Sequence, residues 1–223
     1  MKVLLAVFLF FSCLCLAEGE PLTPLTPVKR GVSSQTAFHN EEIGTFPDFL
    51  LEGKAAYFLP TGDRFKKIYQ GGGIYGVECS GKVKDFLYAW ASVDSFVKSG
   101  TAYGTCSQSS THIFFLPLGL GLKVFFPFKA FDFWLGGGAT GVYVHVRDKN
   151  PDVIPSISKW GLGGIVKGGM LVSFTDLLFI DLFASYLSLT IPFQDTRGGT
   201  VIPHKGDLSG WTLGASLGFR FGN

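Results

Sequence analysis

The residues of this chain best suited to catalysis are its histidines and the hydroxyl side chains near them. The histidines are His39, His112, His145 and His204. A hydrolase needs a histidine beside a serine and a third group that orients the histidine. The nearest approach is the run Ser109-Ser110-Thr111-His112, in which Ser110 shares a strand face with His112 and Thr111 does not. We interpret His112 as a solvated rim residue and expect the chain not to be an enzyme, with a lipid-modifying enzyme as the less favoured alternative.

A second set of chemically active side chains consists of charged residues inside otherwise apolar segments. Each lies on the small or polar side of a segment that alternates with period two. They are Glu52, Lys54, Glu78, Asp94, Lys123, Lys167, Asp181 and Arg220. Buried charges are stable only when paired and hydrogen-bonded. Because the set holds equal numbers of acids and bases, we predict a salt-bridge network that fills an interior. No Cys-x-x-Cys pair or phosphate-loop setting accompanies it, so we expect no metal and no cofactor.

The segment from Gly210 to Phe221 shows which elements hold these charges. Its alternate positions are Trp211, Leu213, Ala215, Leu217, Phe219 and Phe221. The residues between them are small or polar and include Arg220. This period of two predicts a strand, and about eleven residues is the length of a tilted strand that crosses a bilayer. We interpret it as the closing strand of a membrane barrel.

The rest of the chain from Leu50 contains seven similar segments. They run from about Leu50 to Leu59, Ile74 to Ser80, Phe86 to Val97, Phe114 to Phe128, Phe131 to Val146, Trp160 to Phe174 and Leu177 to Ile191. The run Gly136-Gly137-Gly138 leaves the register of the fifth segment open. Between the segments we expect a short helical turn at Arg64–Gln70 and polar loops at Lys98–Ser110, Arg147–Lys159 and Gln194–Leu208. The fold class predicted is all-β, an eight-stranded antiparallel up-and-down transmembrane barrel.

Composition favours a membrane barrel over a soluble protein. Charged residues make up 16% of the 223-residue chain, against about a quarter in soluble domains. No stretch after the first segment offers about 18 uninterrupted apolar residues, as a membrane helix requires. An open sheet edge in hydrocarbon costs several kcal/mol per unsatisfied group, which requires closure. A soluble β-sandwich is the alternative. The net charge of +2 and the absence of a basic block exclude a nucleic-acid partner.

The connections and the aromatic residues divide the barrel into two ends. Long polar connections alternate with very short ones, as outer loops alternate with periplasmic turns. Tyr57, Trp160 and Trp211 fall near long connections. Eight phenylalanines fall near short ones: Phe126, Phe128, Phe131, Phe133, Phe174, Phe179, Phe219 and Phe221. We therefore predict two lipid-interface girdles, the second made of Phe126, Phe128, Phe174, Phe219 and Phe221. An even strand number places both termini on the periplasmic side.

The residues before Leu50 have a different character. Lys2, an apolar run and Ala17 predict a cleaved signal peptide over residues 1–17. A lipoprotein signal at Cys13 or Cys15 is an alternative. Residues 18–49 are rich in proline and threonine, which predicts an extended periplasmic tail or linker before the barrel of residues 50–223. Cys79 and Cys106 either pair or, as we favour for Cys79, serve as small apolar strand residues.

The eight strands, their alternation and the aromatic end of the last strand resemble the small outer-membrane barrels of Gram-negative bacteria. This group includes the OmpA transmembrane domain, OmpW and the opacity-type proteins. The phrases at Gly72–Glu78, Pro117–Lys123, Trp160–Ile165 and Asp207–Gly210 are similar to uncharacterised barrels of the chlamydial group. The resemblance covers residues 50–223 and implies an outer-membrane location and folding by the barrel-assembly machinery. Such chains commonly end in Phe, whereas here Gly222 and Asn223 follow Phe221.

Three functions follow from this interpretation. The first, which we favour, is a structural or surface-interaction barrel with a filled lumen, embedded in the lipid bilayer and contacting a host or envelope protein through its outer loops. The second is a narrow pore for small, including apolar, solutes, which the resemblance to OmpW also implies. The third is the lipid-modifying enzyme named above.

Overall fold

The computed structural model of the protein describes residues 47–103, 108–128, 131–148, 156–197 and 200–222. The predicted signal peptide, most of the predicted tail and Cys106 lie outside these residues. The described part of the chain contains no helix long and apolar enough to span a bilayer.

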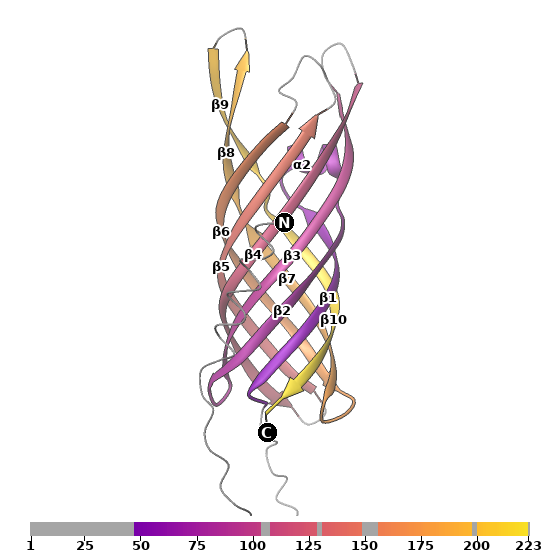
Figure 1. Ribbon diagram of the computed structural model, residues 1–223, viewed down its shortest axis with the longest axis vertical. Helices are drawn as coiled ribbons and strands as arrows, with labels where there is room; N and C mark the ends of the chain where they lie inside the picture. Colours follow the sequence, from indigo (N-terminus) through magenta and orange to yellow (C-terminus); the bar gives the residue numbers. More distant parts are fainter. Residues whose placement is uncertain (1–46, 104–107, 129–130, 149–155, 198–199, 223) are drawn as a thin grey trace, which may run out of the picture. The chain divides into compact units, whose positions relative to one another are not determined.

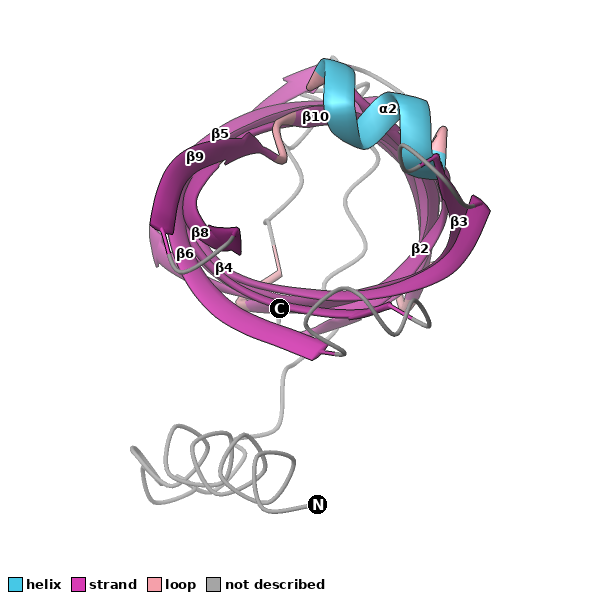
Figure 2. Ribbon diagram, turned by 90° about the horizontal axis from the view of Figure 1, so that it is seen from above, coloured by secondary structure: helices cyan, strands magenta, loops and turns pink. Residues whose placement is uncertain are grey.

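Eight strands close into one antiparallel barrel (Figures 1 and 2). They are β1 (Phe49–Pro60), β2 (Gly72–Lys84), β3 (Leu87–Tyr103), β4 (Gln108–Phe128), β5 (Phe131–Asp148), β6 (Ser156–Ser173), β7 (Leu178–Ser188) and β10 (Gly210–Phe221). Their order around the ring is β1-β10-β7-β6-β5-β4-β3-β2. The last strand pairs with the first along its whole length, from Phe49↔Phe221 to Pro60↔Gly210. The predicted fold class is confirmed.

Each barrel strand alternates between the inside and the outside of the ring. On β10, Leu213 and Leu217 are exposed on the outer surface while Ser216 and Gly218 are buried. On β5, whose register the sequence left open, Trp134 and Val142 point inward, and Leu135 points outward. Every strand therefore gives one face to the interior and one, mostly apolar, to the surroundings.

At the end with the long connections, the strands extend further than the sequence indicates. Strand β3 continues to Tyr103 and β4 starts at Gln108, so the predicted loop at Lys98–Ser110 is wrong for most of its length. Likewise β5 reaches Asp148 and β6 starts at Ser156, which shortens the predicted Arg147–Lys159 loop. The prediction ended each strand where apolar alternation stopped. Beyond a bilayer the outer face no longer needs apolar residues, so pairing continues through polar ones.

The predicted loop at Gln194–Leu208 is also wrong, because it is largely a hairpin. Strand β7 ends at Ser188, before the predicted Ile191, and β8 (Thr190–Arg197) pairs with β9 (Thr200–Asp207) in a separate two-stranded sheet. Its base is held at Ser209, whose hydroxyl accepts a hydrogen bond from the Leu189 amide at 3.0 Å.

The helical turn expected at Arg64–Gln70 is present as α2 (Asp63–Tyr69), between β1 and β2. It ends at Gln70, which has a left-handed backbone with φ of 60°. Gly71 follows with φ of 122°, and a Cβ there would come within 2.6 Å of the Phe58 carbonyl oxygen. Seen from above, α2 lies over one side of the barrel mouth (Figure 2).

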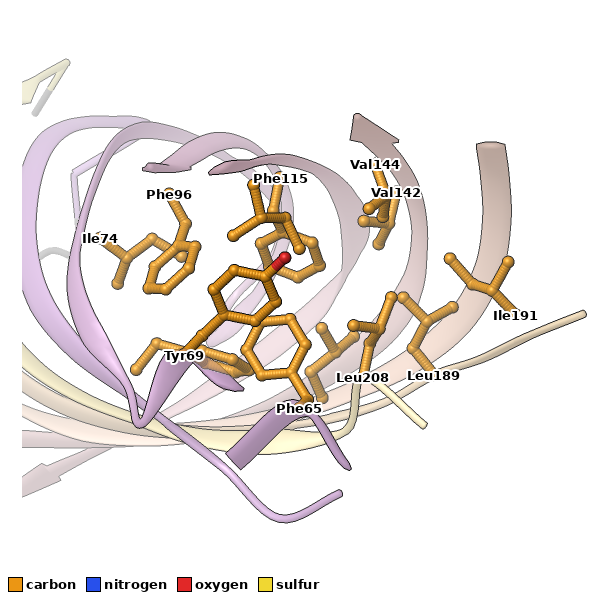
Figure 3. Packing of buried hydrophobic residues seen from close by; sticks show 13 residues of the cluster. Phe65, Tyr69, Ile74, Phe96, Phe115, Val142, Val144, Leu189, Ile191 and Leu208 are labelled. Carbon is orange, nitrogen blue, oxygen red and sulfur yellow. The ribbon is translucent and has the colours of Figure 1, made fainter. Parts of the chain in front are cut away.

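Two apolar clusters occupy the interior, one toward each end. The outer cluster includes Phe58, Phe96, Phe115 and the α2 residues Phe65 and Tyr69 (Figure 3). The inner cluster consists of Leu50, Tyr88, Phe125, Trp134, Leu171 and Phe179, with Phe183 packed against it. Between them lie most of the buried charged residues, among them Glu52, Lys54, Glu78, Lys123 and Lys167.

Candidate functional site

Glu78 on β2 is the centre of a buried charged layer. Its Oε1 accepts a hydrogen bond from Lys123 Nζ at 3.3 Å. Its Oε2 accepts from Lys54 Nζ at 3.4 Å and from Lys167 Nζ at 2.5 Å. Three ammonium groups thus share one carboxylate, and the side chain of Glu78 is only 4% exposed.

Two further carboxylates balance these lysines. Glu52 accepts a hydrogen bond from Lys123 at 3.1 Å and another from the Ser216 hydroxyl at 2.8 Å. Asp94 lies 2.8 Å from Lys54 Nζ. Glu52 and Glu78 are direct register partners on β1 and β2. Adjacent like charges repel, and Lys123 offsets this repulsion because its ammonium contacts both.

The pairing pattern places this layer across the lumen. Strands β2 and β6 occupy opposite positions of the ring, so the Lys167–Glu78 bond spans the barrel. Strands β1 and β4 are three positions apart, and the Lys123–Glu52 bond therefore also crosses the interior. These ion pairs link strands on different sides of the barrel that share no backbone hydrogen bonds.

Two tryptophans complete the layer. Lys167 Nζ lies 3.3 Å from the centroid of the Trp90 ring, and Lys123 Nζ lies 5.1 Å from that of Trp134. Such cation–π contacts are worth about 2 kcal/mol or more when desolvated. The indole N–H of Trp134 donates to Asp181 Oδ1 at 2.8 Å. Asp181, the fourth acid of the layer, therefore has an aromatic partner rather than a lysine.

The eighth charged residue of the predicted set, Arg220, lies apart from this layer. Its guanidinium is 3.4 Å from Asp132 Oδ2, on β5. Sequence reasoning missed Asp132 because the register of β5 was unassigned. Once Trp134 is known to face inward, the period of two places Asp132 on the same face. The structure thus brings seven predicted residues into one layer and gives the eighth its own partner.

Several interior glycines, expected to make room for long basic side chains, make room for aromatic rings instead. A Cβ at Gly119 would come within 2.9 Å of the Trp90 ring, and one at Gly169 within 2.7 Å of the Trp134 indole nitrogen. A Cβ at Gly218 would overlap the ring of Phe179. Gly136 serves the expected purpose, since it lies against Lys123. Phe179 and Phe183 lie on the inward face of β7 and fill the lumen.

The packed lumen leaves little free space. A cavity of about 50 Å³ remains beside Glu52, Lys54 and Asp181, which is room for a few water molecules. Drug-sized ligands occupy about 300 Å³ or more. In the described residues, the arrangement can therefore hold walls together but offers no chamber for a substrate.

The outside of the barrel carries the predicted interface aromatics. All eight are exposed: Tyr57, Trp160, Trp211, Phe126, Phe128, Phe174, Phe219 and Phe221. They lie at the two ends of an apolar belt. Ten positions separate the outward residues Phe133 and Tyr143 on β5, which at about 3.4 Å per residue and a tilt of about 40° is roughly 26 Å of depth. The apolar band of outer-membrane barrels is about 25 Å tall.

Two histidines at the outer end, His112 and His145, each have a serine partner on a neighbouring strand. His112 Nδ1 lies 2.8 Å from the hydroxyl of Ser99 on the neighbouring strand, whereas Ser110 is the register partner of Thr101. His145 Nδ1 lies 2.8 Å from the hydroxyl of Ser158. Both imidazoles are on the outer surface of the wall.

The architecture matches solved membrane barrels. Neisserial surface protein A superimposes with a TM-score of 0.53 at 12% identity, over 78% of this chain and 97% of that one. Outer membrane protein W of E. coli superimposes with a TM-score of 0.54 at 14% identity, over 80% of this chain and all of that one. No family model matches the sequence, and no curated protein matches it. The chain shares the fold of the small eight-stranded outer-membrane barrels, as the resemblance predicted.

Proposed function

We propose that this chain is an integral outer-membrane barrel with a closed lumen, whose role is structural or surface-interactive. The observation that carries the proposal is the bond network of Glu78, which joins lysines from β1, β4 and β6 between two apolar clusters. Such a network stabilises the wall and fills the passage through it. The fold it shares with outer-membrane barrels supports the location.

The outer surface supports insertion into a bilayer. Between the two aromatic girdles, large apolar side chains such as Leu122, Leu162 and Leu217 are more than half exposed. Soluble proteins rarely expose a contiguous apolar patch of this extent. Lys123, Lys167 and Arg220 of the same strands point inward, where each has an ion-pair partner. A lipid bilayer is the environment that fits this distribution of side chains.

Three barriers in series support a closed lumen. Phe65 and Tyr69 of α2 enter the outer mouth, where Phe65 packs edge-on against Phe58 with ring centroids 6.1 Å apart. The charged layer lies below them. The inner cluster, with Tyr88 against Phe125 at 4.9 Å, follows toward the other end. A solute would have to displace all three.

The elements at the outer end support a surface role. The β8–β9 hairpin, the extended ends of β3 to β6 and α2 all lie at the same end of the barrel (Figure 1). On α2 and the extended end of β4, polar side chains such as Lys66, Lys67 and Ser110 are exposed, and exposed segments of this kind commonly carry binding functions. At the opposite end, Phe219 and Phe221 close β10 and suit the barrel-assembly machinery, with Gly222 beyond them.

Planar bilayers test closure directly. The full mature chain is first checked for a mobility difference between unboiled and boiled samples on SDS gels, which a stable barrel gives. We then expect no single-channel conductance above leakage. Reproducible conductance from heat-modifiable protein would overturn the closed lumen and favour the narrow pore. Uptake of a small apolar solute by vesicles that contain the protein would also overturn the closed lumen, and it would favour a pore for apolar solutes.

The enzymatic alternative has its own test. Cells expressing the chain, or its Ser110→Ala/His112→Ala variant, are compared by mass spectrometry of lipid A. We expect the same lipid A masses in both and in cells without the chain. A mass change that requires the two side chains would establish the enzyme.

A further inference from the structure

A band of polar side chains covers the outer surface of β3 to β6 just beyond the aromatic girdle. The register sets it in two rows. The outermost row is Ser99, His112, Arg147 and Ser156, each the direct partner of the next. The row below is Val97, Phe114, His145 and Ser158. Neither row contains an acidic residue, and Tyr143 and Trp160 of the girdle lie directly below.

Neighbouring serines set the orientation of both imidazoles. Ser99 holds His112 and Ser158 holds His145, each through Nδ1 at 2.8 Å. Ser158 also accepts a hydrogen bond from the Tyr143 hydroxyl at 3.2 Å. Because a hydrogen bond holds Nδ1 of each imidazole, Nε2 of the same ring points away from that bond. The band therefore presents two oriented Nε2 atoms beside an arginine.

The wall is hollowed at this point. A surface depression is lined by Val97, His112, Ile113, Phe114, His145 and Arg147. Its outward-facing side chains are the apolar Val97 and Phe114 and the nitrogen-bearing His112, His145 and Arg147, whereas Ile113 belongs to the interior cluster. Arg147 is exposed, so its guanidinium is available to a ligand in the depression. Arginine binds phosphate oxygens bidentately, and imidazole and hydroxyl groups add further donors.

The depth of the band matches lipid headgroups. Along a strand tilted by about 40°, two residues correspond to about 5 Å of depth. The two rows therefore lie about 5 and 10 Å beyond Tyr143 and Trp160. The polar headgroup region extends about 5–8 Å beyond the hydrocarbon on each side, so the lower row lies within it and the outer row lies just beyond it, where the long Arg147 side chain can still contact a headgroup. A binding site for a soluble anion would need neither a position at headgroup depth nor the adjacent apolar side chains of Val97 and Phe114.

We infer that this band binds the phosphorylated headgroup of an outer-leaflet lipid. The inference rests on the proposed insertion of the barrel in the outer membrane. Arg147 binds the phosphate, and His112 and His145 donate further hydrogen bonds to it. Val97 and Phe114 contact the apolar part of the lipid next to the phosphate. The aromatic pair Tyr143 and Trp160, with centroids 5.3 Å apart, borders the acyl chains.

Native mass spectrometry of the full mature chain in detergent micelles tests the inference. The probes are diphosphorylated lipid A, the same lipid A with its phosphates removed, and inorganic phosphate. The variants are Arg147→Gln, the triple variant Arg147→Gln/His112→Gln/His145→Gln, and the control Lys67→Gln. Lys67 is an exposed cation of α2 outside the band. The gel mobility shift is measured for each, so that loss of the barrel, which would count against the proposed function, is separated from loss of the site.

We expect the unaltered chain to bind diphosphorylated lipid A at least about tenfold more tightly than the dephosphorylated form. The triple variant should lose this preference while keeping the mobility shift, Arg147→Gln should lose most of it, and Lys67→Gln should keep it. Equal affinity for the two lipids, or a preference unchanged in the triple variant, would overturn the inference. Competition by inorganic phosphate at equal concentration would also overturn it, because the ligand would then be a free anion rather than a lipid.

Discussion

Glu52 on β1 and Glu78 on β2 are direct register partners, and both carboxylates are buried. Two acids side by side in a barrel interior repel each other unless a cation lies between them. Lys123 reaches from β4 and donates to both, at 3.1 and 3.3 Å. A lysine three strands from β1 and two from β2 thus stabilises the pairing of β1 with β2 at this point.

Replacing Lys123 by methionine should destabilise the barrel strongly. The lysine side chain is 1% exposed, and its loss leaves two buried carboxylates with too little compensating charge. Breaking a buried pair from one side costs about 3–5 kcal/mol. We expect a loss of that order in the free energy of unfolding, measured by urea titration of the vesicle-inserted protein with the gel mobility shift as readout.

Two further variants separate charge from packing in this experiment. Lys123→Met combined with Glu52→Gln should recover part of the lost stability, because one of the two carboxylates is then neutral. Lys84→Met, at an exposed position of β2, should leave the free energy of unfolding unchanged. A double variant no more stable than Lys123→Met would show that the lysine acts through packing alone.

Gly218 on β10 offers a test of the ring-and-glycine packing. It is the register partner of Phe179, which is fully buried, and an added Cβ would overlap the phenylalanine ring. Gly218→Ala should therefore cost about 1–3 kcal/mol, the usual range for overpacking, in the same urea titration. At Gly164 an added Cβ meets nothing within 4 Å, so Gly164→Ala should cost nothing. Adding Phe179→Leu to Gly218→Ala should restore stability; if it does not, the glycine is needed for another reason.

The barrel could be predicted from the sequence because a membrane imposes one rule on every spanning strand. Residues such as Leu213 and Leu217 must face lipid, and this yields period two along the whole segment. The rule ceases at the outer interface. Tyr103 and Gln108 lie in extensions of β3 and β4 that the sequence does not reveal, and the β8–β9 hairpin is predicted as a loop for the same reason.

The charged residues were predictable one by one but their partners were not. Period two places Lys167 and Glu78 on inward faces, yet only ring closure shows that their strands stand opposite each other. The Arg220–Asp132 pair was missed because three consecutive glycines left the register of β5 open. Glycine has no side chain to mark a face, and the pairing of β5 with β4 supplies what the local pattern lacks.

Leu217 on β10 tests the membrane-facing surface. It is 54% exposed on the outer side, six positions from the girdle residue Trp211 and four from Phe221, near the middle of the apolar belt. An arginine at the midplane of a barrel costs about 2–4 kcal/mol, whereas near an interface it costs about 0–1. Leu217→Arg should therefore lower the free energy of unfolding in vesicles by about 2–4 kcal/mol. Val83→Arg, on the exposed end of β2, should change it by less than about 1 kcal/mol. Equal costs at the two positions would contradict the proposed orientation in the bilayer.

Helix α2 should depend on two aromatic anchors for its position in the outer mouth. Phe65 and Tyr69 are each 6% exposed, and the Tyr69 hydroxyl lies 3.1 Å from that of Thr111 on β4. A seven-residue helix is too short to be stable by itself, so its order must come from these contacts. In Phe65→Ala/Tyr69→Ala, amide hydrogen exchange of α2 should become at least about tenfold faster while the amides of β1 and β10 keep their protection. Lys67→Ala, at an exposed position of the same helix, should leave exchange unchanged or slow it, because alanine favours helix. If α2 in the double variant exchanged as slowly as in the unaltered chain, the backbone bonds at Gln70 and Gly71, rather than the aromatic anchors, would hold the helix over the mouth.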